Sequence, residues 1–326
     1  MRVLVTGGAG YIGSHTVKVL RERGDQVVVL DTLEHGHRAA IGKTPLIIGS
    51  THDQGLVKEV ILDRKIEAVI HFAAYKAAGE SMTAPAKYFD NNVNGTLRLL
   101  QAVRQEGVKY FVFSSTAALY GTPKTLPVRE TDELRPENPY GESKLMVEQM
   151  LRWFDACHGL RSIALRYFNA AGAAPDGRMG EDPRRAANLV PLVMNAATGR
   201  APHVKVFGTD YPTPDGSAIR DYIHVMDLAE AHARALDYLR EKDRTDVFNL
   251  GTGQGASVLE VLNAARRITG INIPAEHVER RPGDPVAVFA DNTKAKTLLG
   301  WQPRYGLEDI ISSAWKWSSS HPDGYK

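Results

Sequence analysis

The chain has 326 residues, of which 43% are hydrophobic and 24% are charged, as in an ordinary folded globular protein. Lysine and arginine total 40 against 38 aspartate and glutamate residues, so the formal charge of +2 argues against a strongly basic surface that would bind nucleic acid or an anionic membrane. This length suits a hydrophobic core that is divided between two domains.

The sequence also bears on cellular location and on metal binding. Cys157 is the single cysteine, which excludes an intramolecular disulfide and a cysteine-rich zinc site, and we expect no bound metal. The first residues lack a basic segment followed by a long apolar one. No apolar run reaches the roughly 20 residues that cross a bilayer. We therefore expect a cytoplasmic protein with no membrane and no nucleic-acid partner.

The first half of the chain alternates strand-like and helix-like segments. Short β-branched runs predict strands at 2–6, 27–30, 46–48, 68–72, 110–113 and 162–166. Helical spacing of apolar residues predicts helices at 11–23, 85–105 and 140–154. Strands separated by helices imply right-handed crossovers, so the fold class is α/β with a doubly wound, Rossmann-type parallel sheet.

The texture changes after about residue 172. Residues 173–188 are rich in Gly, Pro and charge and predict a loop. Further on, 227–240 and 257–269 look helical, with Asp227 and Ser257 as N-caps, and 247–250 looks like a strand. We expect a larger domain at 1–178 and a smaller α/β domain at 179–326, with segments near 222–250 returning to the first.

A glycine-rich turn follows the first predicted strand and opens the first predicted helix. Gly7, Gly10 and Gly13 have the spacing G-x-x-G-x-x-G. Glycine permits a tight turn and a close approach of pyrophosphate to the backbone, and the helix N-terminus presents N–H groups to phosphate. A bare turn is the alternative, but the strand, the glycines and the helix together predict a dinucleotide site.

Asp31 stands at the end of the second predicted strand, where a carboxylate can bond the ribose hydroxyls of NAD. The same charge would repel the 2′-phosphate of NADP. Arg38 lies nearby in the sequence and would favour that phosphate, so the prediction is NAD with NADP disfavoured.

Tyr140 and Lys144 form a Y-x-x-x-K pair, and residues four apart share one face of a helix. A nearby ammonium group and a positive nicotinamide ring would both favour the phenolate. Such a pair is common by chance on an amphipathic helix. Here it follows the strand ending near Thr116, whose hydroxyl could bond a reacting oxygen at the carboxyl edge of the sheet.

With these pieces in place, the chain resembles the UDP-sugar 4-epimerases of the extended short-chain dehydrogenase family over nearly its whole length. The motifs that carry this resemblance are FAAYKAAGES at 72–81, DNNVNGT at 90–96, SSTAALYG at 114–121, PYGESK at 139–144, RYFNAAGA at 166–173, GTDYPTPDGSAIRDYIHVMDLA at 208–229 and RRPGD at 280–284.

The resemblance implies an isomerase that inverts the 4-position of a UDP-hexose such as UDP-glucose or UDP-galactose through a 4-keto sugar, with NAD bound throughout. It implies that Tyr140 is the acid/base, that Lys144 tunes it and that Thr116 assists proton transfer. The implied cofactor contacts are Gly7, Gly10, Tyr11, Ile12, Gly13, Asp31, Phe72, Ala73, Lys76, Asn91, Tyr140, Lys144 and Phe168.

The implied contacts to the UDP-sugar are Lys76, Thr116, Tyr140, Asn169, Asn188, Leu189, Phe207, Arg220, Arg281, Asp284 and Val288. Arg220 and Arg281 suit a diphosphate because a guanidinium bonds two oxygens at once, although an arginine is also often part of a surface ion pair. The resemblance further implies a homodimer formed through the helices near 85–105 and at Tyr140.

Two positions depart from the family pattern. The family usually has Gly-Asp-Ile after the third strand, with the aspartate beside the adenine, whereas this chain has Ser50 after Gly49. Some members have a tyrosine at the position of Val288, beside the sugar. A smaller side chain leaves room for a 2-acetamido group, so UDP-N-acetylhexosamine remains an alternative substrate.

Other functions compete with this interpretation. A 4,6-dehydratase would have an Asp-Glu pair after Thr116, and the sequence has Ala117 and Ala118 instead. An epimerase of a UDP-pentose or a UDP-uronate is harder to separate by sequence. A silent NAD-sensing protein would lose the Tyr140–Lys144 pair, which this chain retains.

Overall fold

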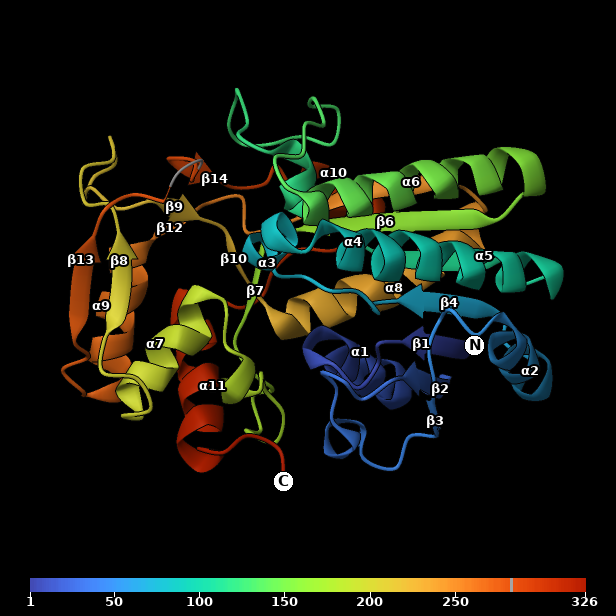
Figure 1. The fold of residues 1–326 in the computed structure, drawn as a ribbon, viewed down its shortest axis with the longest axis horizontal. Coiled ribbons are helices and arrows are strands. Elements are labelled where there is room, and N and C mark those ends of the chain that lie inside the picture. Colours follow the sequence, from blue (N-terminus) through green and yellow to red (C-terminus); the bar gives the residue numbers. More distant parts are fainter. Residues whose placement is uncertain (282–283) are drawn as a thin grey trace.

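A seven-stranded parallel sheet organises the larger part of the molecule. The computed structural model describes residues 1–281 and 284–326 (Figure 1). The strand order is β11-β6-β5-β4-β1-β2-β3, as a doubly wound sheet requires. The strands are β1 (Arg2–Thr6), β2 (Gln26–Asp31), β3 (Leu46–Ile48), β4 (Ala68–His71), β5 (Tyr110–Ser114), β6 (Arg161–Tyr167) and β11 (Asp246–Leu250).

Both faces of this sheet are covered by helices. On one face pack α1 (Tyr11–Glu22) and α8 (Val225–Lys242), and on the other α2 (Gln54–Arg64), α5 (Gly95–Gln105) and α6 (Pro139–His158). Side chains alternate between the faces along a strand. Val3 and Val5 therefore join one core cluster while Leu4 joins the other. Apolar side chains on both faces explain why these strands are short continuous apolar runs.

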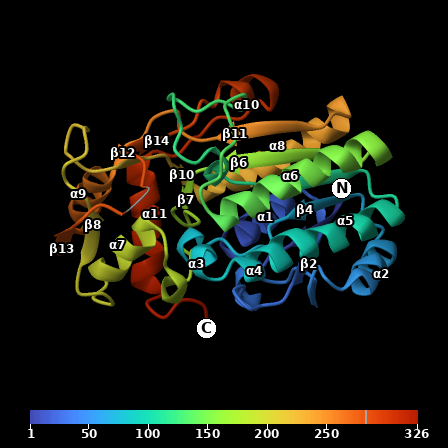
Figure 2. The same cartoon turned by 45° about the horizontal axis from the view of Figure 1, so that its top comes forward.

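A smaller α/β region lies beside the sheet, at its carboxyl edge (Figures 1 and 2). Its helices α7 (Leu189–Ala197), α9 (Val258–Thr269) and α11 (Leu307–Ser320) share a third core cluster. Its strands are β8 (Val204–Phe207) with β13 (Ala275–Val278), and β9 (Ile219–Arg220) with β12 (Ala256–Ser257) and β14 (Ala287–Val288). The remaining elements are β7 (Asn169–Ala171), β10 (Tyr222–His224), α3 (Ala78–Thr83), α10 (Thr293–Leu298) and the 3₁₀ turns Arg38–Ile41, Ala117–Tyr120 and Pro183–Arg185.

The helix predicted at 85–105 is not uniform, and this prediction is corrected. It consists of α4 (Pro85–Tyr88), a π-helical stretch Phe89–Asn94 and α5. Asn92 explains the change, because its amide donates to the Tyr75 carbonyl at 3.1 Å and to Ser143 Oγ at 3.0 Å. These tertiary bonds hold the side chain inward, and π turns of this kind often occur at functional sites.

One predicted N-cap was wrong and the other is confirmed. Helix α8 begins at Val225, and the cap is His224, whose Nδ1 accepts from Met226 N at 3.1 Å. Asp227 lies in the first turn, where its carboxylate accepts from the backbone N–H groups of Arg304 and Tyr305. Ser257 caps α9 as predicted, because its Oγ accepts from Glu260 N at 3.0 Å in a capping box.

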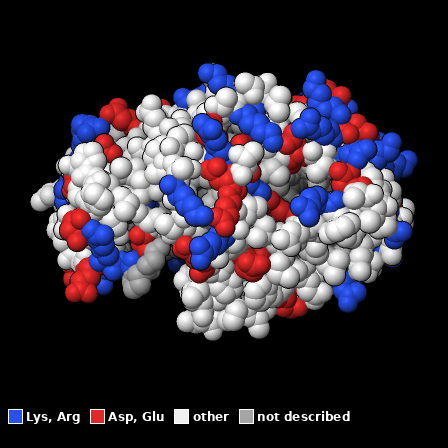
Figure 3. Space-filling view, turned by 90° about the horizontal axis from the view of Figure 1, so that it is seen from above, with Lys and Arg blue, Asp and Glu red and all other residues white. Residues whose placement is uncertain are grey.

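The described residues contain no helix that is long and apolar enough to cross a membrane. Acidic and basic side chains are interspersed on the face shown in Figure 3, as the nearly neutral composition leads one to expect.

Candidate active site

The carboxyl edge of the sheet holds a pocket of about 130 Å³. It is formed by the segments that follow β1, β2, β3 and β4, together with the π-helical stretch. Six of the predicted cofactor residues line it: Gly7, Gly10, Asp31, Phe72, Ala73 and Asn91. Open α/β sheets bind their ligands at this edge, so the pocket lies where a dinucleotide would bind.

The glycine turn has no room for side chains at two of its positions. Gly7 has a φ of +68°, and a Cβ there would lie 2.5 Å from Ala73 N. A Cβ at Gly13 would lie 2.3 Å from the Gly7 carbonyl oxygen. Gly10 is the N-cap residue of α1 and has no side chain to occupy the helix terminus. This cradle therefore fits the pyrophosphate of NAD, as a dinucleotide-binding turn should.

Asp31 ends β2 at the wall of this pocket. Its Oδ2 accepts from Ala9 N at 2.9 Å and its Oδ1 from Leu33 N at 2.8 Å. These bonds orient the carboxylate, and each oxygen retains a lone pair for a ribose hydroxyl. Arg38 donates to the Thr44 carbonyl at 2.7 Å, a contact within its own loop. The donor set therefore fits NAD better than NADP.

Helix α6 brings Tyr140 to the same edge of the sheet. Asn138 caps the helix by accepting from Gly141 N at 2.9 Å, and Pro139 occupies the first turn, so Tyr140 is at the very start. Thr116 follows the end of β5 and lies near enough to the Tyr140 hydroxyl to act on its pKa. The predicted tyrosine and hydroxyl are thus brought together from segments more than twenty residues apart.

The surroundings of Tyr140 and Lys144 oppose their charged forms. Burial raises the pKa of Tyr140, while the Thr116 hydroxyl and the charge of Lys76 act in the lowering direction. Burial lowers the pKa of Lys144 to about 7, although the charge of Glu148 acts to raise it. Lys144 Nζ donates to the Ser114 carbonyl at 2.9 Å and lies 4.7 Å from the Phe113 ring centroid. Further positive charge near Tyr140 must therefore come with the ligands.

Lys76 lies close to the same site but is bonded elsewhere. Its Nζ is 3.0 Å from Glu181 Oε1 and 6.0 Å from the centroid of the Tyr11 ring. The Tyr11 hydroxyl donates to the Gly172 carbonyl at 2.6 Å. Glu181 was not predicted, because nothing near it in the sequence marks a partner 105 residues away.

The predicted sugar-nucleotide contacts gather in the smaller region. The Arg281 guanidinium lies 3.7 Å from the centroid of the Phe207 ring. Arg220 forms an ion pair with Asp284 and also donates to the Ile219 carbonyl at 2.7 Å. Two residues of the RRPGD motif, 282 and 283, lie outside the described residues.

Val288 links this group to the segment that follows Thr116. It is 8% exposed and pairs with Arg220 between β14 and β9. It packs with Ala117 and Tyr120, which directly follow Thr116, and with Phe168. Phe168 was predicted to contact the cofactor, and in the structure it lies in this cluster rather than among the residues that line the pocket.

The remaining predicted residues occupy loop and helix ends. The Asn169 amide donates to the Asp221 carbonyl at 3.3 Å. Asn188 is the N-cap residue of α7, and its side chain makes no capping bond in the described structure, while Leu189 begins that helix. Ile12 is half-buried against the core below the glycine turn. Ser50 lines the pocket, and its Oγ lies 3.0 Å from His52 Nδ1.

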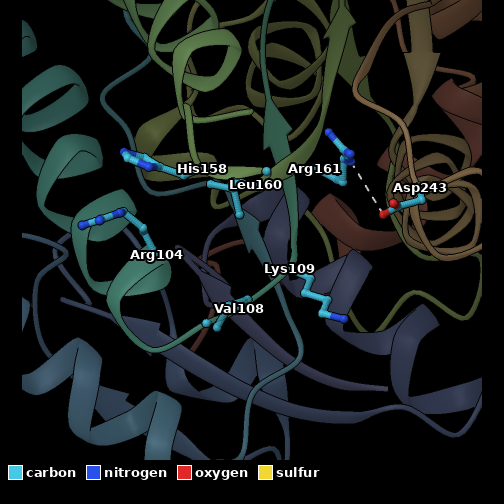
Figure 4. A pocket seen from close by; sticks show the side chains of 9 residues that line it. Arg104, Val108, Lys109, His158, Leu160, Arg161 and Asp243 are labelled. Atoms are coloured by element: carbon cyan, nitrogen blue, oxygen red, sulfur yellow. Dashed lines mark ion pairs between the residues drawn. The ribbon is translucent and has the colours of Figure 1, made fainter. Parts of the chain in front are cut away.

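A larger hollow of about 300 Å³ lies at the opposite, amino edge of the sheet (Figure 4). Arg104, Lys109, His158 and Arg161 line it, but their side chains point in different directions, and Arg161 is paired with Asp243. The strands present their carboxyl ends elsewhere, so this hollow is not the candidate active site. Among residues 1–281 and 284–326, no cluster of side chains is arranged to hold a metal ion.

Comparison with known proteins now decides the family. The model of the NAD dependent epimerase/dehydratase family matches residues 3–251. The chain belongs to this family. It is 50% identical to a UDP-glucose 4-epimerase of Halalkalibacterium halodurans over 326 residues, which is 100% of this chain and 98% of that protein.

Solved structures agree with the sequence comparison. The UDP-glucose 4-epimerase of Bifidobacterium longum, in complex with NAD+ and UDP, superposes with a TM-score of 0.94 at 42% identity and covers 100% of both chains. The UDP-Glc/GlcNAc 4-epimerase of Campylobacter jejuni superposes with a TM-score of 0.87 at 40% identity, covering 98% of this chain and 99% of that one. The α/β fold with a smaller second region is thereby confirmed, and the cofactor of this family is NAD.

Several pocket residues were missed at the sequence level. They share one feature, a place just after a strand at the carboxyl edge: Thr32, Glu34, His35, Gly36, Thr51, Ala74 and Tyr75. The rule that ligands bind at this edge would have nominated these positions once the strand ends were known.

Proposed function

We propose that Tyr140, Thr116 and Lys144 carry the chemistry by which this enzyme epimerises the 4-position of a UDP-hexose. The chain is an NAD-dependent epimerase, as the full-length identity of 50% to a UDP-glucose 4-epimerase establishes. The observation that carries the residue roles is that Tyr140 lies beside Thr116 at the carboxyl edge of the sheet, with Lys144 bonded to the Ser114 carbonyl behind them at 2.9 Å. The glycine cradle of the cofactor opens at the same edge.

The tyrosine hydroxyl exchanges a proton with the sugar. Tyr140 Oη takes the proton of the 4-hydroxyl as the C4–H bond breaks, and Thr116 passes that proton between the two oxygens. Bound NAD supplies the acceptor and then the donor of the C4 hydride, together with a positively charged ring. The configuration at C4 is inverted when the 4-keto sugar turns, so that the hydride would return to the opposite face of C4 while Tyr140 gives its proton back to O4.

The smaller region holds the nucleotide while the sugar turns. It presents two guanidinium groups: Arg281 lies over Phe207 of β8, and Arg220 of β9 pairs with Asp284. A diphosphate suits such groups because each binds two oxygens. We propose residues 1–178 as the NAD domain and 179–326 as the sugar-nucleotide domain. The return of 222–250 to the first domain is supported by the pairing of β11 with β6.

A second candidate substrate is a UDP-N-acetylhexosamine. Val288, at the position expected to lie beside the sugar, is a small residue, and it packs beside the segment that follows Thr116. The similar enzyme from Campylobacter jejuni acts on both UDP-Glc and UDP-GlcNAc. A shortened wall at this position would leave volume for an acetamido group without altering the proton chemistry at Tyr140.

We also propose a cytoplasmic homodimer. Met146 and Trp153 are seven residues apart on α6, so they share a helix face, and they are 37% and 63% exposed. Large apolar side chains on one exposed face are typical of an interface. The second copy would cover α6 and the neighbouring α5, which lie side by side on the outside of the sheet (Figure 2). The single, exposed Cys157 suits a reducing compartment.

The test is conversion of UDP-galactose to UDP-glucose by purified protein with no NAD added. We expect turnover by the native protein and its loss in Tyr140→Phe, which keeps the ring but removes the proton donor. Thermal unfolding of both proteins checks that they are folded. No conversion by folded native protein, with or without NAD, would contradict the UDP-hexose assignment, and UDP-xylose and UDP-glucuronate would then be assayed.

A further inference from the structure

The face of α6 that carries Tyr140 and Lys144 carries one more polar residue. Glu148 is four residues beyond Lys144, so the three side chains lie on one stripe of the helix. The end of β5 faces this stripe. The Ser114 carbonyl accepts from Lys144 at 2.9 Å, and the Ser115 hydroxyl donates to Glu148 at 2.6 Å. Two successive residues are thus each held by one residue of the stripe, and the next residue, Thr116, lies beside Tyr140.

Glu148 is itself held by a buried arginine. Arg166, on β6, donates through Nε to Glu148 Oε1 at 3.0 Å and through Nη2 to Oε2 at 2.6 Å. The two side chains are only 4% and 8% exposed. Arg166 Nη1 also donates to the Tyr120 hydroxyl at 2.8 Å, and Tyr120 donates to Asn249 Oδ1 at 2.7 Å. Glu148 therefore has one fixed orientation beneath the end of β5.

A buried ion pair is seldom the most stable way to fill a core, because well-packed apolar side chains of similar volume often stabilise as much or more. This pair stands directly behind the catalytic residues. We propose that Glu148 is a positioning residue for the epimerisation, which holds Ser115 and hence Thr116 in place and fixes a negative charge one helical turn beyond Lys144. This inference rests on the proposed function.

The other groups around Lys144 cannot supply that charge. His71, on β4, is neutral because burial, and to a smaller extent the charge of Lys144, lower its pKa to about 3. Tyr167, on β6, stays protonated because burial raises its pKa, and its hydroxyl lies 2.5 Å from Ser114 Oγ. Burial also raises the pKa of Tyr140, which favours its neutral form. Glu148 is the one group whose negative charge raises the pKa of Lys144 against its burial.

The experiment compares Glu148→Gln with Asp155→Asn in the NAD-loaded enzyme. Glutamine keeps an oxygen for Ser115 but loses the charge. Asp155 is a matched control because it lies on the same helix and pairs with an arginine, Arg161. It is seven residues from Glu148, about 10 Å along the helix. The readout is the alkaline limb of the pH profile of kcat/KM for UDP-galactose.

We expect the alkaline limb of Glu148→Gln to move to lower pH by about 1 unit, since the ammonium form is lost earlier. Asp155→Asn should superimpose on the native profile. A second readout does not depend on turnover. Ultraviolet titration of tyrosinate, with Tyr140→Phe as the blank, should show Tyr140 ionising at higher pH in Glu148→Gln than in the native protein.

An unchanged alkaline limb in folded Glu148→Gln would overturn the proposal, whatever its absolute rate. If the single variant does not fold because Arg166 is left unpaired, the double variant Glu148→Gln, Arg166→Met removes both charges. The alkaline limb of the double variant must also lie at lower pH than that of the native enzyme. If the two limbs coincide, the proposal is overturned. Failure of the native protein to convert UDP-galactose would contradict the proposed function instead, and the tyrosinate titration would still test the role of Glu148.

Discussion

Lys144 Nζ lies 2.9 Å from the carbonyl oxygen of Ser114, the last residue of β5. The bond ties the helix that carries Tyr140 to the strand that leads to Thr116. It also leaves a buried ammonium group whose pKa burial lowers to about 7, with the opposing influence of Glu148. In the proposed catalytic pair, the pKa of the lysine therefore lies close to neutral pH.

Lys144→Met should lower kcat by about 100-fold or more, because the site loses the positive charge that stabilises the phenolate. The substrate KM should change far less, since Lys144 is buried behind Tyr140. Steady-state kinetics with UDP-galactose measures both. Lys205→Met, at an exposed position of β8, is the control and should behave as the native enzyme. A KM effect without a kcat effect in Lys144→Met would contradict this role.

Thr116→Val should move the acid limb of the pH profile to higher pH. Burial raises the pKa of Tyr140, and the Thr116 hydroxyl acts to lower it. Removal of this hydroxyl should therefore raise the pKa of Tyr140 further. Thr116→Ser keeps a hydroxyl and should retain the native limb. The measurement is kcat/KM between about pH 5 and about pH 9 for the three proteins. If the acid limbs of the valine and serine variants lie at the same pH, the Thr116 hydroxyl does not influence the pKa of Tyr140.

Gly13→Ala should lose NAD and stability together. Its Cβ would lie 2.3 Å from the Gly7 carbonyl oxygen, so the glycine cradle must shift. NAD released from the purified, denatured protein is quantified by chromatography, and unfolding is followed by heat. Gly79→Ala is the control, because no atom lies within 4 Å of its added Cβ. Native NAD content in Gly13→Ala would show that the cradle does not hold the pyrophosphate.

The free energy of unfolding should fall as the pH is lowered from about 7 to about 5, in part through His71. This ring bonds Thr6 Oγ1 at 2.6 Å and Thr96 Oγ1 at 2.8 Å, and burial lowers its pKa from 6.5 to about 3. Below pH 6.5 the unfolded chain binds a proton that the folded chain does not, so stability is lost as the pH falls toward the folded pKa.

For His71 the loss at about pH 5 amounts to about 2 kcal/mol. Urea unfolding at the two pH values measures it. His71→Asn should show a smaller loss between them, although it is less stable at both. His203→Gln, at a partly exposed position, is the control and should show the native loss. If His71→Asn loses as much unfolding free energy between the two pH values as the native protein, His71 does not contribute to the pH dependence of stability.

Trp153→Glu should convert the dimer to a monomer, because a charge would enter the centre of the proposed apolar contact on α6. Sedimentation velocity at micromolar concentration measures the mass. Leu62→Glu is the control: its side chain is 60% exposed on α2, away from the proposed contact, and the variant should stay dimeric. A native protein that sediments as a monomer would contradict the homodimer itself.

Local patterns in the sequence determined much of the outcome. The glycine spacing, the position of Asp31 at the end of β2 and the Ser257 cap each depend on neighbours within a few residues, and the structure has all three as expected. The parallel, doubly wound sheet followed from the alternation of strands and helices, because right-handed crossovers leave few topologies open. The sequence also predicted that Tyr140 and Lys144 share one helix face, since helical geometry alone puts residues four apart on one side.

Contacts across the chain were decided only by the tertiary structure. Glu181 meets Lys76, and Arg166 meets Glu148 beneath Ser115, from elements that no periodicity relates. The π-helical stretch at Asn92 likewise arises from bonds to Tyr75 and Ser143 rather than from local propensity. The spacing of hydrophobic residues along one segment shows which face of that segment is buried. The residue that packs against this face, and its charge, depend on how the whole sheet packs.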